Sequence, residues 1–183
     1  MVALGGNVDS AAGPPAATLA AALTRLSDSP LQIVECSPIY TTPCFPEGSG
    51  PEYVNAAVCL SGLNDPHAVL AVLHAIEAEF GRERDRRWGR RTLDLDLIGI
   101  GDLLLPDLET YLFWRDLPLD RQMQEAPDRL ILPHPRLQDR GFVLVPLNDV
   151  APDWRHPVSG QTVRDMLAAL DPDQIARIRP IQG

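Results

Sequence analysis

Residues 81–101 read GRERDRRWGRRTLDLDLIGIG, and the second half of this stretch decides how the fold is interpreted. From residue 93 to residue 97 leucine alternates with aspartate, which is the period-two pattern of a half-buried strand. Side chains two residues apart share one face of a strand, so Asp94 and Asp96 are predicted to project together while the leucines point into a core. Neighbouring carboxylates repel each other unless a cation lies between them.

The first half of the stretch is strongly basic, because six of the sixteen arginines of the chain fall between residues 82 and 91. The chain has no lysine, so phosphate recognition would fall to arginine, backbone amides and metal. Mg²⁺ typically takes carboxylates together with substrate phosphates, and the two halves therefore indicate a magnesium–polyphosphate site. An acidic solvent-facing strand beside a solvated arginine loop is the alternative, and it stays open for this stretch taken alone.

Composition limits the class of protein. A chain of 183 residues is most simply one domain, here residues 1–183, with room for a sizeable core. It contains no apolar run of about 18 residues and no signal-peptide pattern, so we expect a cytoplasmic protein that does not cross a membrane. Its three cysteines lack metal-ligand spacing and indicate reduced thiols. A formal charge of −9 argues against nucleic-acid binding.

The predicted elements follow the order βαββαβ, which is the ferredoxin-like pattern of the α+β class. It predicts a mainly antiparallel sheet with both helices on one face and with C-terminal additions. The alternation around residue 55 places Tyr53 and Asn55 on one face of their strand, so the open face of the sheet would carry them beside Asp94 and Asp96. The strands are predicted at 2–4, 31–40, 53–60 and 92–100, and the helices at 15–26 and 66–80, the second with Glu77 on its solvated side.

The rest of the chain is less regular. Residues 102–128 mix aromatic residues, acids and prolines, which predicts an ordered excursion folded onto the body or onto a partner chain. After it come three basic side chains within seven residues, His134, Arg136 and Arg140. Short helices are predicted at 142–150 and 162–170, and the last residues are expected to fray.

Several motifs agree with one family. They are ALGGN at 3–7, SPIYTTP at 37–43, PEYVNAAV at 51–58, RWGRRTLDLDLI at 87–98 and LPHPRLQDRGFVLVPL at 132–147. In these motifs the chain resembles the 6-hydroxymethyl-7,8-dihydropterin pyrophosphokinases, folate-pathway enzymes that move a diphosphate from ATP to a pterin alcohol. The resemblance threads nearly the whole chain except residues 102–128, and it implies the same ferredoxin-like fold. It departs at Gly6, where the family usually has serine, and at Cys44 and Phe45.

The resemblance also implies roles for individual residues. Asp94 and Asp96 would be the ligands of two Mg²⁺ ions, and Arg82 and Arg91 would stabilise the transferring group. The pterin ring would be hydrogen-bonded by Asn55 and sandwiched by Tyr53 and Phe142. Its pocket would be completed by Gly5, Thr42, Pro43, Cys44 and Phe45. ATP would be held by Arg84, Arg87, His134 and Arg140, with Glu77, Trp88 and Leu97 near the nucleotide.

Two other functions remain open on the residues alone. A nucleotidyltransferase would also use two carboxylates on one strand but would release pyrophosphate instead of AMP. A ferredoxin-like regulatory module would bind a small ligand without Mg²⁺ and would give no reason for clustered arginines. For the pyrophosphokinase the expected partners are ATP and the pterin. We expect a monomer, with a weak dimer through residues 102–128 as the alternative.

Overall fold

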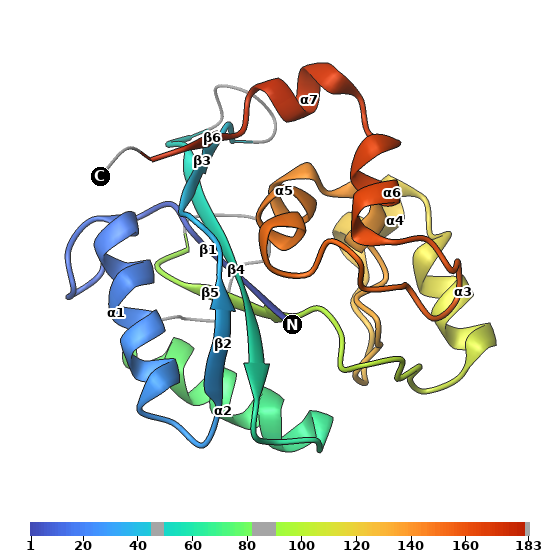
Figure 1. The fold of residues 1–183 in the computed structure, drawn as a ribbon, viewed down its shortest axis with the longest axis horizontal. Coiled ribbons are helices and arrows are strands. Elements are labelled where there is room, and N and C mark those ends of the chain that lie inside the picture. Colours follow the sequence, from blue (N-terminus) through green and yellow to red (C-terminus); the bar gives the residue numbers. More distant parts are fainter. Residues whose placement is uncertain (45–49, 82–90, 182–183) are drawn as a thin grey trace.

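The computed structural model describes residues 1–44, 50–81 and 91–181, and its centre is one antiparallel sheet (Figure 1). The strand order is β5-β1-β4-β3-β6, with β2 also paired to β4, and every pairing is antiparallel. The mixed α+β class and the mainly antiparallel sheet are therefore confirmed. The strands are β1 (Val2–Gly6), β2 (Gln32–Cys36), β3 (Tyr40–Thr42), β4 (Tyr53–Ser61), β5 (Asp94–Leu97) and β6 (Arg179–Pro180).

The strand predicted at 31–40 is divided into β2 and β3 around Pro38. Proline has no N–H to give to a neighbouring strand, which explains why regular pairing stops there. Ser37 bridges the gap, because its backbone N–H donates to the Ala57 carbonyl at 3.0 Å and its Oγ accepts from the Ala57 N–H at 2.9 Å. The segment therefore stays attached to β4 on both sides of the break.

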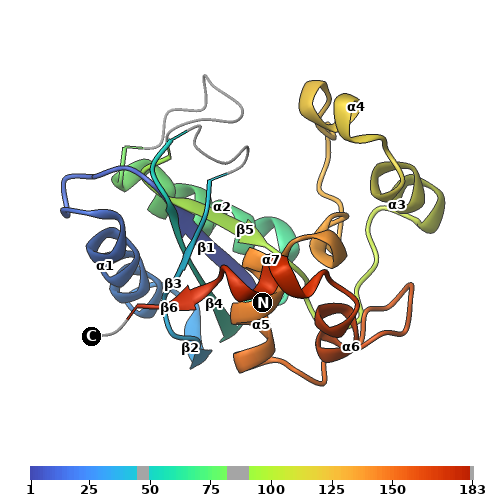
Figure 2. The same cartoon turned by 90° about the horizontal axis from the view of Figure 1, so that it is seen from above.

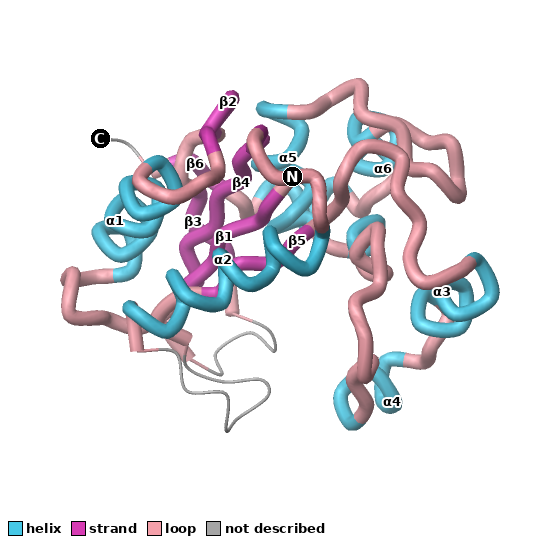
Figure 3. The backbone as a smooth tube through the Cα atoms, turned by 90° about the horizontal axis from the view of Figure 1, so that it is seen from below, coloured by secondary structure: helices cyan, strands magenta, loops and turns pink. Residues whose placement is uncertain are grey.

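Helices α1 (Pro15–Ser27) and α2 (Pro66–Glu79) cover one face of the sheet, as predicted, and lie next to each other (Figure 3). Asp65 caps α2 by accepting from the His67 N–H at 3.1 Å, and Gly81 follows the helix with a φ of 76°, which side chains disfavour. The core between these helices and the sheet is made by alternate strand residues and the helical stripes. It includes Val2, Leu4, Leu19, Leu26, Leu73, Ile76, Leu95 and Leu97.

The C-terminal helices cover part of the other face, so the helices are not confined to one side (Figure 1). Helix α5 (Gly141–Val150) packs against the sheet and helix α6 (Val163–Ala168) packs on α5, and both share one hydrophobic cluster with Ala3 and Ala57. The Tyr40 hydroxyl donates to Asp149 Oδ2 at 2.7 Å and ties α5 to β3. Beyond α6, α7 (Pro172–Ala176) leads into β6, where the Ile181 N–H donates to the Ile39 carbonyl at 2.8 Å. The prediction of a frayed end was thus wrong for β6.

The excursion predicted at 102–128 folds onto the body of the protein. It contains α3 (Leu108–Arg115) and α4 (Leu119–Gln124), which lie on the opposite side of the molecule from α1 (Figure 2). A short 3-10 helix, η1 (Leu137–Asp139), follows before α5. In the ranges that the structure describes, no helix combines the length and the apolar character needed to span a membrane.

Candidate active site

The register of three strands brings the predicted site residues together on the face opposite α1 and α2. Gly5 of β1 lies between Asp94 of β5 and Asn55 of β4. In the next row on the same face, two residues along each strand, Ala3 lies between Asp96 and Ala57. Directly paired residues of neighbouring strands project from the same face, so both carboxylates and the amide share one surface.

Asp94 is paired with Arg91, the last arginine of the basic stretch. Arg91 Nη1 donates to Asp94 Oδ2, and the side chains are 30% and 17% exposed. Asn7 fixes the Arg91 backbone on both sides: its Oδ1 accepts from the Arg91 N–H at 2.9 Å, and its N–H donates to the Arg91 carbonyl at 2.9 Å. Asn7 was not among the predicted site residues. Its place directly after Gly5 and Gly6 was the feature of the sequence that could have indicated it.

A second basic group reaches the carboxylates from the segment between the excursion and α5. Arg140 Nη1 lies 4.0 Å from Asp96 Oδ2, and the guanidinium stands 5.6 Å from the centre of the Phe142 ring. Burial lowers the pKa of Arg140, while the nearby Asp96 and Asp94 carboxylates raise it. The group stays charged at neutral pH, because guanidinium begins from a very high pKa.

His134 belongs to the same segment. Burial, followed by the charges of Arg140 and Arg136, lowers the pKa of His134 to about 3. The ring is therefore neutral at pH 7, and its Nδ1 accepts from the Arg136 N–H at 3.2 Å. That contact places the ring proton on Nε2, which can donate to an anion. The His134 backbone N–H donates to the Ile98 carbonyl at 2.8 Å and ties the segment to the end of β5.

The expected pterin residues are arranged around Asn55. Its side chain is 6% exposed, and its Nδ2 donates to Thr42 Oγ1 at 2.8 Å. A Cβ on Gly5 would lie 2.9 Å from Asn55 Oδ1, so the glycine leaves the space that this amide occupies. Tyr53, paired with Thr42, is partly buried, and burial raises the pKa of its hydroxyl.

The remaining pocket residues lie around these strands. Pro43 and Cys44 continue from β3, and the Cys44 thiol donates to the Gly50 carbonyl at 3.2 Å. Phe142 stands in the first turn of α5 and is 38% exposed, which leaves its ring available for a ligand. The predicted residues Phe45, Arg82, Arg84, Arg87 and Trp88 lie outside the described residues.

Glu77 and Leu97 do not lie on the open face. Leu97 is buried in the core under α1 and α2, and Glu77 is only 1% exposed, so the prediction of a solvated Glu77 was wrong. Glu77 Oε1 accepts from the Leu95 N–H at 2.8 Å. The carboxylate thus supports β5 from beneath, at the residue between Asp94 and Asp96.

The donor set fits a hard cation shared with a phosphate. No group of three or more His, Cys, Asp or Glu side chains forms a metal site in the part of the chain that the structure describes. Asp94 and Asp96 supply carboxylate oxygens from one strand face, and 17% and 37% of their side chains remain exposed. Two carboxylates completed by phosphate oxygens and water are a usual arrangement for Mg²⁺.

Known proteins resemble this chain over most of its length. Residues 1–152 match the model of the 7,8-dihydro-6-hydroxymethylpterin-pyrophosphokinase (HPPK) family. The chain belongs to the HPPK family. The 2-amino-4-hydroxy-6-hydroxymethyldihydropteridine pyrophosphokinase of Synechocystis sp. is 37% identical over 181 residues, covering 98% of this chain and 80% of that protein. The enzyme of the same name from Pseudomonas aeruginosa is 38% identical, covering 97% of this chain and 94% of its own.

Solved structures support the HPPK fold. The crystal structure of Plasmodium falciparum HPPK-DHPS with SDX-DHP has a TM-score of 0.60 at 18% identity. The match covers 91% of this chain but only 42% of that one, so the chain spans less than half of the Plasmodium protein. Family membership confirms the resemblance found in the motifs and the activity it implied, that of a pyrophosphokinase of folate biosynthesis.

Proposed function

We propose that the open face of the sheet carries out diphosphate transfer from ATP to 6-hydroxymethyl-7,8-dihydropterin. The observation that carries this proposal is the strand register, which sets Asp94 in one row with Gly5 and Asn55 and places Asp96 in the next row on the same face. A polyphosphate site and a site for a flat heterocycle therefore adjoin on one surface. In the reaction the pterin hydroxymethyl oxygen bonds to the β-phosphorus, the bond between that phosphorus and the α-β bridging oxygen breaks, and AMP leaves with the bridging oxygen.

The basic groups would bind the triphosphate. Arg91 and Arg140 stand next to the carboxylates, and each guanidinium can contact two phosphate oxygens. His134 would donate its Nε2 proton to another oxygen. On the family resemblance we assign Arg82, Arg84, Arg87 and Trp88 to the same nucleotide, with Arg82 and Arg91 acting on the transferring group. Such positioning and charge compensation are the main requirements of phosphoryl-type transfer.

The two aspartates would hold Mg²⁺, for which we propose two ions. When bound, these ions would compensate charge on the attacking and leaving oxygens. Asp96 is the more exposed of the pair. We propose that Asp96, assisted by the metal, accepts the proton of the pterin hydroxyl group. Arg91 and Arg140 orient the two carboxylates before the substrates arrive.

The pterin would bind at the other end of the surface. Asn55, held by Thr42, presents amide groups that can hydrogen-bond the edge of the ring. Tyr53 and Phe142 would stack on its faces, while Gly5, Pro43, Cys44 and Phe45 complete the pocket. We further propose that the protein acts in the cytoplasm as a monomer, with residues 102–128 as the surface of any weak dimer.

The product distinguishes this function from its rivals. Purified protein with MgATP and the reduced hydroxymethylpterin should release AMP in equal amount to a diphosphorylated pterin, measured by chromatography. Pyrophosphate release would indicate nucleotidyl transfer, and ADP release would indicate transfer of one phosphate. Pterin binding without any nucleotide turnover would favour a regulatory module.

A further inference from the structure

The excursion between β5 and η1 is fastened to the body at several points. Its stem is a bridge in which Leu105 N–H donates to the Leu132 carbonyl at 2.8 Å and Leu132 N–H donates back at 3.2 Å. Before the stem, Trp154 Nε1 donates to the Gly101 carbonyl at 2.8 Å. Within α3, the Tyr111 hydroxyl lies 2.8 Å from His156 Nε2. One C-terminal segment, residues 154–156, therefore holds both the start of the excursion and its first helix.

The contact between Tyr111 and His156 has a defined chemistry. Tyr111 is fully buried, and His156 is 3% exposed. The backbone N–H groups of Val158 and Ser159 donate to His156 Nδ1 at 3.1 and 3.3 Å, so the ring proton is on Nε2 and is donated to the tyrosine oxygen. Burial lowers the pKa of His156 and raises the pKa of Tyr111 to about 12, which keeps both groups neutral at pH 7.

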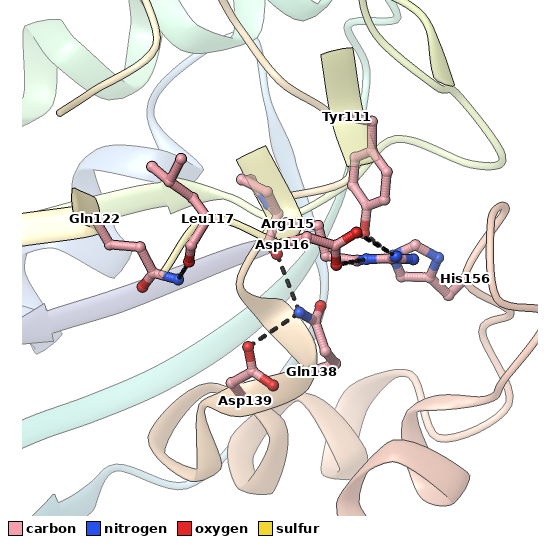
Figure 4. A network of polar contacts seen from close by, with 9 residues as sticks. Tyr111, Arg115, Asp116, Leu117, Gln122, Gln138, Asp139 and His156 are labelled. Atoms are coloured by element: carbon pink, nitrogen blue, oxygen red, sulfur yellow. Dashed lines mark hydrogen bonds and ion pairs between the residues drawn. The ribbon is translucent and has the colours of Figure 1, made fainter. Parts of the chain in front are cut away.

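This contact lies against the segment that carries two of the proposed nucleotide ligands. Figure 4 shows Tyr111 and His156 together with Arg115 at the end of α3 and with Gln138 and Asp139 of η1. Gln138 Nε2 donates to the Pro135 carbonyl at 3.1 Å and holds the turn after His134.

The 134–140 segment, which carries His134 and Arg140, is therefore fixed from two directions. On the sheet side, the His134 N–H donates to the Ile98 carbonyl. On the other side, the excursion supplies the stem at Leu132, two residues before His134, and Figure 4 shows the end of α3 beside Gln138 and Asp139 of η1. Among the described residues, the hydrogen bond between Tyr111 and His156 is the most deeply buried side-chain hydrogen bond between the excursion and the rest of the protein.

We propose that Tyr111 and His156 are positioning residues that hold the 134–140 segment in place and thereby set the affinity for the nucleotide. The proposal rests on the proposed role of His134 and Arg140 in binding ATP. Neither Tyr111 nor His156 touches the substrates. Loosening their contact would let the segment move, so nucleotide affinity would fall. The pterin side is built on β3, β4 and Phe142 of α5, and it would keep most of its affinity because the Tyr40–Asp149 hydrogen bond holds α5 to β3 independently.

The test is Tyr111→Phe, which removes one hydroxyl and keeps the ring. We expect the KM for ATP, and the Kd of a non-hydrolysable MgATP analogue measured by calorimetry, to rise roughly three- to tenfold. The kcat and the KM for the pterin should stay within about twofold. Leu108→Ala, at a residue of the same helix that is 49% exposed, is the matched control and should change none of these constants. His156→Gln keeps a donor toward Tyr111 and should retain most of the nucleotide affinity.

The opposite results are equally informative. A Tyr111→Phe protein that melts at a lower temperature but binds the analogue with wild-type Kd would overturn the proposal, because the contact would then be merely structural. Equal loss of affinity for nucleotide and pterin would also overturn it. If Tyr111→Phe does not fold, the Kd of the MgATP analogue is compared between His156→Gln and His156→Ala. The proposal expects weaker binding in His156→Ala, and equal Kd values in these two variants would contradict it. Wild-type protein that makes no AMP would refute the proposed function, and the calorimetric comparison would still test the positioning role.

Discussion

Glu77 offers the sharpest test of how β5, the strand that carries the two proposed metal ligands, is held in place. Strand β5 ends the sheet path, with β1 as its paired neighbour in the sheet. The Leu95 N–H therefore uses the Glu77 carboxylate as its acceptor, at 2.8 Å and with Glu77 only 1% exposed. Replacing Glu77 by alanine removes that acceptor and leaves a buried N–H group.

The size of the effect follows from these contacts. A buried N–H that loses its acceptor costs about 1–3 kcal/mol, and the lost side-chain packing adds about 1 kcal/mol. Relief from burying a charge offsets part of this. We expect Glu77→Ala to lower the free energy of unfolding by about 2–3 kcal/mol. Glu77→Gln keeps a carbonyl oxygen at the same place and should cost about 1 kcal/mol or less.

Turnover should fall together with the free energy of unfolding, because Leu95 lies between the two proposed metal ligands. A displaced β5 moves Asp94 and Asp96 together, so turnover of Glu77→Ala should fall at least about tenfold. Urea unfolding gives the stability, and AMP release gives the turnover. Glu79→Ala is the matched control: this exposed glutamate of the same helix pairs with Arg25 at 2.8 Å, and its loss should leave both measurements nearly unchanged. Wild-type stability in Glu77→Ala would refute the reasoning.

Four further predictions concern the site and its surroundings. Asp94→Asn and Asp96→Asn should each lower turnover by roughly 10²–10⁴ with little change in urea unfolding, and near-wild-type rates would rule out the metal role. Excess chelator should stop AMP release and added Mg²⁺ restore it; release that persists in chelator contradicts the metal assignment. Phe142→Ala should raise the pterin KM about tenfold in a fluorescence titration, whereas an equal rise in the ATP KM would argue against stacking. Burial lowers the pKa of His156 below its unfolded value of about 6.5, so the unfolded chain binds more protons below that pH. The stability that neutral His156 contributes should therefore be fully present above about pH 6.5 and fall on acidification by up to about 1.4 kcal/mol per pH unit. His134, whose pKa is also lowered, adds a fall of the same sign, so stability should fall less steeply in His156→Gln than in the wild type, and an equally steep fall would exclude His156 as a cause.

The sequence predicted the parts of the site that depend on local periodicity. The alternation at 93–97 was enough to place Asp94 and Asp96 on one strand face, because the side-chain period of a strand is two residues. The βαββαβ order then predicted the mainly antiparallel sheet and the two helices on one face, but not the sixth strand β6. The alternation within each strand determines which face a residue occupies. It does not determine that Gly5 lies opposite Asp94 and Asn55, because that register depends on contacts between distant segments.

Glu77 shows why a local pattern can mislead. Helix α2 places Val69, Leu73 and Ile76 in the core, and a charged residue beside that stripe is normally solvated. Residue 77 lies one turn beyond Leu73 on the same face of the helix, so its carboxylate is carried under the sheet. It is stable there because β5 presents an N–H group in need of an acceptor. The burial of Glu77 therefore depends on the Leu95 N–H, 18 residues away in the chain, which the helical pattern around Glu77 does not reveal.

The C-terminal helices predicted at 142–150 and 162–170 are confirmed by α5 and α6, but their packing on the sheet could not be predicted from the sequence, and we expect it to limit where substrate binds. Helix α5, with α6 behind it, covers Ala3 and Ala57, so these two positions belong to the core, while Asp96 beside Ala3 at the edge of the sheet stays 37% exposed. One step along the strands, Gly5 and Asn55 stay outside this cluster, and β3 ends nearby at Thr42. In the proposed function a pterin ring would therefore bind toward the Gly5 end, between the carboxylates and the Asn55 amide. The hydrogen bond from Tyr40 to Asp149 holds α5 at this boundary, and so a contact between residues 109 positions apart would set the limit of the proposed pterin site.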